Sequence, residues 1–245
     1  MTGADPQPRS AVVFGARNLG RAVIETLLAA GWSVTGVARS DATLEAVAAA
    51  GARAAAGDVT DPVSVAGALA EAAAAHGPVG LAVNAASTYG GNRSGPFGGG
   101  PIADATADAF DSWAAAPARS AFSFLSAAGR FMLDQGLPAT LVQVTGGSAR
   151  RAMAGRGLWA AGSFGVRAIT NAAALELRER GVHVALLIVD AGIQPIAGQP
   201  RAGVTPEALA DPYQVAEAVR FLAEQGSRGA THELTITPLG ERWVP

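Results

Sequence analysis

Two segments of this chain, residues 140–144 and 182–189, are dominated by Val, Leu and Ile. A strand that has one face in water alternates apolar and polar side chains, and these segments alternate very little. Such runs are typical of strands inside a parallel sheet whose two faces are both covered by helices. Parallel neighbours also need a long crossover connection, which is usually a helix. The chain is therefore predicted to be an α/β protein.

The rest of the sequence repeats this alternation of strand and helix. Further strands are predicted at residues 11–14, 33–37, 52–56, 79–83 and 234–237, and helices at residues 19–28, from 41, and at 62–75, 110–133, 158–180 and 214–224. Right-handed crossovers between them give a doubly wound, Rossmann-type parallel sheet of about seven strands with helices on both faces. A binding crevice is expected at the carboxyl ends of the strands.

A single domain is predicted from residue 10 to residue 245, after a polar N-terminal tail formed by residues 1–9. Residues 87–101 are rich in Gly and Pro, which is typical of a mobile loop. Strands resume after this loop, so it is not a linker between domains.

Composition excludes several classes of function. Hydrophobic residues make up 49% of the 245 residues and charged residues 16%, so the chain must bury a large core. A net charge of −2 gives no broad basic surface, and we expect no nucleic-acid partner. The absence of cysteine and the wide spacing of three histidines argue against a metal site. With no signal-like start and no membrane-length apolar run, we expect a cytoplasmic protein without a membrane partner.

Residues 14–21, with the sequence FGARNLGR, lie between the first predicted strand and its helix. Glycines in such a turn let backbone N–H groups approach a pyrophosphate, which the helix N-terminus stabilises. Together with residues 57–60, 81–87 and 172–179, residues 12–23 resemble the short-chain dehydrogenase/reductase superfamily, over residues 10–237. The resemblance implies a seven-stranded sheet, NAD(H) or NADP(H), hydride transfer at an oxygen-bearing carbon, and a homodimer or homotetramer.

The glycines of this loop depart from the family pattern, in which the second and third follow the first by four and six residues. Counting back from Gly20 puts Asn18 in the second place and Phe14 in the first, whereas a one-residue deletion makes Gly15 the first. Asn18 replaces a glycine in both alignments. The exchange is mild because Asn tolerates a left-handed backbone. A strand–helix turn that binds no ligand is the alternative interpretation.

Two arginines bear on the choice of dinucleotide. Arg39 follows the second strand, where an NAD-preferring chain has an acidic residue for the ribose 2′-hydroxyl, and Arg17 lies in the loop. A 2′-phosphate suits guanidinium geometry, so NADP(H) is favoured over NAD(H), unless both arginines are solvated surface charges. Asp58 resembles an adenine contact and could equally cap the turn before Pro62. The predicted cofactor-binding residues are Gly15, Arg17, Asn18, Leu19, Gly20, Arg39, Asp58, Val59, Asn84 and Ala85.

The resemblance fails at the residues that move protons in the family. These are a Tyr, a Lys four residues later, a Ser about thirteen residues before the Tyr, and an Asn on the preceding long helix. At these positions the chain has Trp159, Ser163, Gly146 and Pro117. An indole N–H has no accessible acid chemistry, and a serine cannot lower the pKa of a phenol. The chain contains no lysine at all, so the family's usual mechanism is not available from these positions.

Polar side chains near the predicted crevice are candidates for the proton transfer that the family's usual residues would perform. We take Ser148, Trp159 and Ser163 as candidate catalytic residues, with Ser148 lying eleven residues before Trp159. A hydroxyl that only stabilises a turn is the alternative for Ser148. Tyr89, on the Gly-rich loop, is a candidate replacement acid or simply a surface aromatic.

Charged residues also follow the last buried strands. Asp190 ends an apolar strand, so its carboxylate must find a partner or shift its pKa upward, and a structural partner such as an arginine is favoured. Arg150, Arg151 and Arg156 form either a clamp for an anionic substrate or a solvated or subunit-contact loop.

Two functions remain. The first is an atypical NADP(H)-dependent oxidoreductase that acts on a small carbonyl or alcohol through an unusual proton donor, and needs no metal. The alternative is a protein of the same fold without redox turnover, such as a cyclase, an isomerase, or a cofactor-sensing or partner-binding protein. The helices at 110–133 and 158–180 carry apolar residues on more than one face, which predicts packing against copies of themselves.

Overall fold

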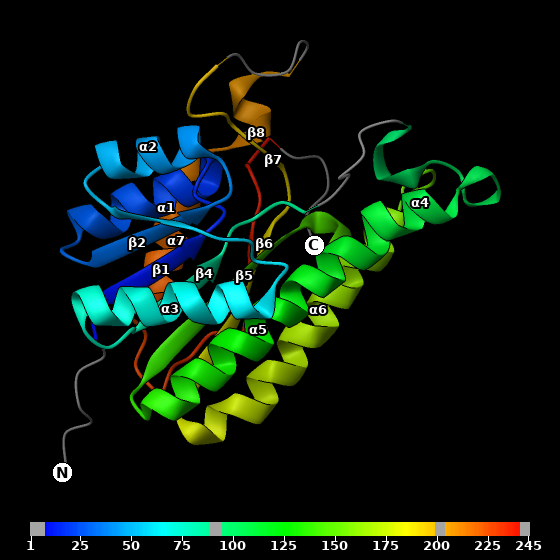
Figure 1. Ribbon diagram of the computed structural model, residues 1–245. Helices are drawn as coiled ribbons and strands as arrows, with labels where there is room; N and C mark the ends of the chain where they lie inside the picture. Colours follow the sequence, from blue (N-terminus) through cyan, green and yellow to red (C-terminus); the bar gives the residue numbers. More distant parts are fainter. Residues whose placement is uncertain (1–7, 89–94, 199–203, 241–245) are drawn as a thin grey trace.

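A computed structural model describes residues 8–88, 95–198 and 204–240 of the chain. Its main sheet has seven strands, all parallel, in the order β3-β2-β1-β4-β5-β6-β9 (Figure 1). The strands are β1 (Ser10–Phe14), β2 (Ser33–Ala38), β3 (Arg53–Ala56), β4 (Leu81–Asn84), β5 (Ala139–Gly146), β6 (Val182–Val189) and β9 (Glu233–Ile236). The doubly wound sheet is thus confirmed. Strand order reverses between β1 and β4, which is where such sheets bind ligands.

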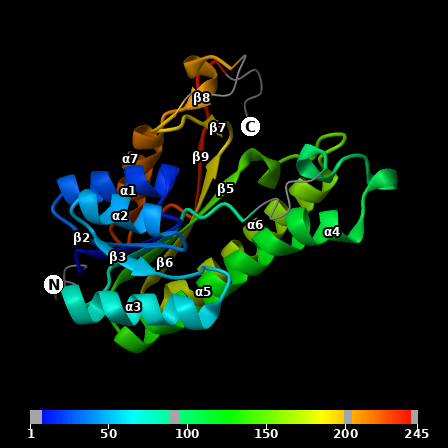
Figure 2. The same ribbon diagram turned by 45° about the horizontal axis from the view of Figure 1, so that its top comes forward.

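Helices cover both faces of the sheet (Figures 1 and 2). One face carries α1 (Asn18–Ala29), α2 (Asp41–Ala49) and α7 (Pro212–Ala223), and the other carries α3 (Pro62–His76), α5 (Ala116–Gln135) and α6 (Gly157–Leu177). Along β6, Val184 packs into the core under α3 and α5, whereas Leu187 packs into the core under α1 and α7. The uninterrupted aliphatic run of β6 therefore reflects burial on both faces.

The helix predicted over residues 110–133 is three consecutive pieces. These are α4 (Ala107–Phe110), a π-helical turn η3 (Asp111–Ala115), and α5, which begins one residue before Pro117. Proline has no N–H and cannot donate to the carbonyl four residues earlier, that of Trp113. A wider turn at this point is one way for a helix to accommodate such a residue.

Part of the Gly-rich segment after β4 is packed against the protein. Phe97 begins a short 3₁₀ turn, η1 (Phe97–Gly99), and Gly100 forms an isolated parallel bridge with Arg156, just before α6. Together with α4, this segment extends beyond the body of the sheet (Figures 1 and 2). Tyr89 lies outside the described residues, as does most of the predicted tail.

A second, two-stranded sheet lies beyond the end of β6, and the sequence analysis did not predict it. It pairs β7 (Gly192–Ile193) with β8 (Leu209–Ala210) in parallel. Two-residue strands carry no periodicity that a sequence pattern can reveal.

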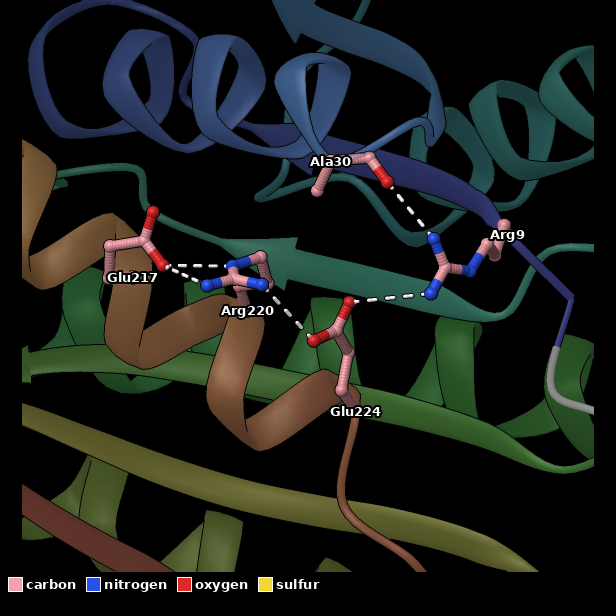
Figure 3. Close-up of polar contacts among 5 residues, drawn as sticks. All are labelled: Arg9, Ala30, Glu217, Arg220 and Glu224. Carbon is pink, nitrogen blue, oxygen red and sulfur yellow. Dashed lines mark hydrogen bonds and ion pairs between the residues drawn. The ribbon is translucent and has the colours of Figure 1, made fainter.

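Polar contacts on the surface connect Arg9, near the start of the described residues, to the C-terminal ends of α1 and α7 (Figure 3). Arg9 donates a 3.0 Å hydrogen bond to the carbonyl of Ala30 and lies 3.7 Å from the carboxylate of Glu224. Arg220 bridges Glu217 and Glu224 along α7. Exposed ion pairs of this kind contribute little stability, so they fix the position of these ends more than they stabilise the fold.

Candidate functional site

A cleft of about 850 Å³ opens at the carboxyl ends of the central strands. This volume is within the range of small-molecule and cofactor sites. Eight of the ten predicted cofactor-binding residues line it: Gly15, Arg17, Asn18, Leu19, Arg39, Asp58, Val59 and Ala85. The residues that the sequence pattern grouped are therefore close together in the structure. Their role in binding a cofactor stays a prediction.

The turn between β1 and α1 forms the floor of the cleft. Gly15 has a φ of +83°, and a Cβ at this residue would lie 2.4 Å from the Cα of Ala86. Only glycine fits both the backbone conformation and the space. Phe14 instead belongs to β1, and its ring packs edge-to-face against Phe124 at 5.8 Å, away from solvent. The structure thus supports Gly15 as the first glycine, in a loop one residue shorter than the family pattern.

The other two predicted residues, Gly20 and Asn84, lie behind the cleft. A Cβ on Gly20 would lie 2.3 Å from the carbonyl oxygen of Gly15, so this glycine lets α1 approach the turn closely. Asn84 is buried and donates to Gln143 at 3.0 Å, while its own oxygen accepts from the N–H of Ala86 at 3.2 Å. Both residues therefore hold the cleft wall in place.

Asn18 does not use the left-handed backbone that the sequence argument invoked. It is the first residue of α1, and among the described residues positive φ angles occur at glycines alone. Its side chain instead reaches the segment after β6. The amide nitrogen donates to the carbonyl of Gln194 at 3.1 Å, and the amide oxygen accepts from the N–H of Ile196 at 2.9 Å.

The β2–β3 end of the cleft carries charge. Arg39 is 75% exposed and lies 3.5 Å from the carboxylate of Asp58. Burial would raise the pKa of Asp58, but hydrogen bonds from the backbone and hydroxyl of Thr60, together with the charge of Arg39, hold this pKa below its ordinary value. Asp58 therefore stabilises the turn before Pro62, which is one of the two sequence interpretations, and it also lines the cleft. Its contact with adenine stays a prediction.

The β5–β6 end of the cleft is neutral. It is lined by Val144, Thr145, Gly146, Val189, Ala191 and Ile193, and none of these side chains is ionisable. The hydroxyl oxygen of Thr145 is buried and has no hydrogen-bond partner within the described residues. Nothing in this part of the described lining can exchange a proton in the ordinary pH range.

The three candidate catalytic residues gather beside this neutral end without lining it. A Cβ on Gly146 would lie 3.5 Å from the indole of Trp159 and 4.0 Å from the hydroxyl of Ser148. The hydroxyls of Ser148 and Ser163 are 2.6 Å apart, and both side chains are buried. The spacing in the sequence did not reveal this pair. A catalytic role for the three residues stays a prediction.

An aromatic cluster packs over Trp159. Its ring meets that of Phe97 edge-on at 5.0 Å, and Phe97 meets Trp113 in the same way at 5.0 Å. The guanidinium of Arg156 lies 5.3 Å from the centre of the Phe97 ring. The indole is therefore held in this cluster beside Gly146 and does not line the cleft.

Asp190 has the structural partner that the sequence analysis favoured. Arg151 donates to both carboxylate oxygens, and a Cβ on Gly147 would lie 1.7 Å from one of them. Arg150 instead donates to Thr235 at 2.8 Å, and Arg156 contacts Phe97. The three arginines thus have separate partners and do not converge as an anion clamp.

No three His, Asp and Glu side chains of the described ranges gather in a way that could hold a metal ion. Within the same ranges, no helix combines the length and the apolar character that crossing a membrane requires.

Comparison with known proteins decides the family. The sequence pattern of the short chain dehydrogenase family matches residues 9–193. The chain belongs to this family. No curated protein matches the sequence.

Solved structures of the family share the fold of this chain. A short-chain dehydrogenase from Rhodopseudomonas palustris is 24% identical, covers 95% of this chain and 100% of its own, and has a TM-score of 0.73. A metagenomic short-chain oxidoreductase solved with NADP is 23% identical, with coverages of 95% and 98% and a TM-score of 0.72. An alcohol dehydrogenase from the archaeon Thermococcus sibiricus, solved with 5-hydroxy-NADP, is 20% identical, with coverages of 97% and 99% and a TM-score of 0.76.

The buried ion pair gives a stability prediction. Replacing Arg151 by leucine leaves the carboxylate of Asp190, 7% exposed, without its main partner. We expect Arg151→Leu to lower the free energy of unfolding by about 3 kcal/mol, measured by urea denaturation. Adding Asp190→Leu should recover a large part of this loss. The exposed Arg130→Leu is the control, and an equal loss in that variant would contradict the assignment.

Proposed function

We propose that this chain is an atypical short chain dehydrogenase that binds NADP(H) in the cleft and acts as an oxidoreductase on a small carbonyl or alcohol. The observation that supports this proposal is the cleft itself, at the switch point of the sheet and lined by eight of the ten residues predicted for the cofactor. The turn from Gly15 to the start of α1 lines the cleft, which fits a pyrophosphate bound at the helix N-terminus.

In this proposal the residues at the charged end select the dinucleotide. The exposed guanidinium of Arg39 is available to pair with a 2′-phosphate, and Asp58 lies beside it to meet the adenine. Two of the similar structures were solved with NADP or an NADP derivative, which agrees with this choice. NADP(H) is therefore proposed over NAD(H).

The neutral end would bind the reacting group. When bound, NADPH supplies the hydride for the carbonyl carbon of the substrate. A hydrogen-bond donor for the substrate oxygen must come from elsewhere than a tyrosine on α6, since Trp159 stands there. We propose the hydroxyls beside Gly146, those of Thr145 and of the Ser148–Ser163 pair, as the source of this donor. All three are buried, so a change of side-chain rotamer must turn one of them toward the substrate, with solvent as the source of the proton.

A second function is favoured by one observation. No described side chain lining the β5–β6 end is ionisable, and the serines next to it are paired with each other. This arrangement suits a protein that binds the dinucleotide and does not turn it over, or one that catalyses a non-redox reaction. The two functions differ in turnover and share the cofactor site.

The first experiment tests the cofactor. NADPH should raise the melting temperature of the protein more than NADH at equal concentration, since tight binding stabilises by mass action. Arg39→Ala should weaken NADPH binding about tenfold or more and leave NADH binding unchanged, because it removes one charge-assisted contact to the 2′-phosphate. Arg53→Ala, an exposed residue at the start of β3, is the matched control. Equal binding of both dinucleotides by the unchanged protein would refute the NADP(H) assignment.

The second experiment separates the two functions. Purified protein with NADPH and a panel of small aldehydes and ketones should oxidise NADPH, and Ser148→Ala or Thr145→Val should lower kcat at least tenfold with the NADPH Kd unchanged. Thr145→Val leaves the fold intact, because it removes a buried hydroxyl that has no described partner. Tight NADPH binding with no turnover across the panel would favour the second function.

We also propose that the protein is a homodimer or homotetramer that packs through α5 and α6. Phe122 on α5 and Phe164 on α6 are 58% and 44% exposed, and packing against a second copy would remove their apolar surface from water. Light scattering during size-exclusion chromatography should therefore give at least twice the mass of the chain. Phe122→Glu with Phe164→Glu should shift it to a monomer, and a monomeric unchanged protein would disprove the assembly.

A further inference from the structure

We infer that Asn18 is a positioning residue, which holds the segment Gln194–Ile196 against the start of α1 before any ligand binds. In this way the backbone that directly follows Ile193, a residue of the cleft lining, is already in place when a dinucleotide arrives. The inference rests on the proposed function for the identity of the ligand, and on the contacts of Asn18 for the rest.

The contacts of Asn18 span the cleft. Asn18 and Ile193 both line it, one from the turn after β1 and the other from β7. The amide of Asn18 makes one hydrogen bond to the carbonyl of Gln194 and accepts another from the N–H of Ile196, at 3.1 and 2.9 Å. Both hydrogen-bonding groups of one side chain are therefore used on the backbone of a segment 176 or more residues away along the chain.

The far side of the same segment is anchored as well. Gln194 donates its N–H to the carbonyl of Ala210 at 2.9 Å, next to the pairing of Ile193 with Ala210. Ile193 and Ile196 also pack against the core beneath α1 and α7. The segment is thus a strip between β8 and Asn18. Apolar packing and β8 keep it near the domain, and Asn18 fixes its backbone against α1.

The residue type matters because the family pattern has a glycine at this position. A glycine has no side chain with which to bridge the two walls of the cleft. Asparagine supplies one donor and one acceptor, the minimum needed to bind a C=O and an N–H two residues apart. Holding a binding wall in its bound conformation removes an ordering cost that would otherwise oppose binding.

The first test uses the protein without ligand. Exchange of the backbone amide of Ile196 should be about tenfold faster in Asn18→Ala than in the unchanged protein, because this N–H loses its acceptor on Asn18. Asn171→Ala, at an exposed position on α6, is the matched control and should leave this exchange unchanged. Asn18→Asp keeps an oxygen for the N–H of Ile196 and loses the donor to Gln194. It should therefore retain protection at Ile196, which a general weakening of the start of α1 would not do.

The second test adds NADPH. The Kd for NADPH should rise about tenfold in Asn18→Ala, and NADPH should restore slow exchange at Ile196 in that variant while changing it little in the unchanged protein. Unaltered exchange in ligand-free Asn18→Ala would overturn the inference. Faster exchange with an unchanged Kd would overturn the positioning role. Failure of the unchanged protein to bind NADPH would refute the proposed function, and faster ligand-free exchange in Asn18→Ala would still support the bridge.

Discussion

The contact between two stretches of backbone, at Gly15 and at Ala86, is the constraint on which the rest of the cleft depends. Here the turn after β1 and the chain leaving β4 come so close that no side chain fits between them. Gly20 then allows α1 to begin directly over the same turn. These two close approaches set the position of the N-terminus of α1 over the switch point of the sheet. This turn is one residue shorter than the family pattern, and Gly15 and Gly20 still permit both close approaches.

The cleft built on this turn is divided by charge. Arg17, Arg39 and Asp58 are its charged described residues, and Arg39 and Asp58 form an ion pair at the β2–β3 end. At the β5–β6 end the polar groups are hydroxyls and backbone. The residues proposed to recognise a dinucleotide and those proposed to take part in proton transfer are therefore separate in space. A sequence can lose the second set without disturbing the first, which is consistent with the pattern of residues in this chain.

Much of the fold could be predicted from the sequence because the sheet is buried on both faces. The aliphatic runs of β5 and β6 follow from that burial, and the bounds of β6 agree with the prediction. The π-helical turn before Pro117 and the two-residue strands β7 and β8 could not be predicted, since each depends on local backbone geometry and not on a repeating pattern. At the site, glycine spacing and the ends of strands identified the residues of the cleft.

What the sequence could not provide was the partner of each polar side chain. A buried aspartate at the end of a strand must have a partner, so the kind of partner that Asp190 needs could be foreseen, and Arg151 fills that place. For Asn18 the glycine pattern suggested a role for the backbone conformation. In the structure it is the side chain that acts, through its hydrogen bonds to Gln194 and Ile196. Ser148 and Ser163 were considered as separate candidates. Their hydroxyls meet because the turn after β5 packs against the first turns of α6. The spacing of residues in the sequence does not reveal such packing.

The neutral serine pair also explains why the usual lysine is difficult to restore at this position. Ser163 is fully buried, and the hydroxyl of Ser148 is the hydrogen-bond partner seen for it. A lysine there would place an ammonium group among buried neutral groups, and such a charge is costly unless an opposite charge or several acceptors surround it. Asp190, which has a buried carboxylate, is already bound by Arg151. In the proposed alignment, where Trp159 and Ser163 stand in the places of the tyrosine and the lysine, the two exchanges belong to one neutral environment and are not independent. A return to the family's chemistry would require a new partner for the charge as well as the two side chains.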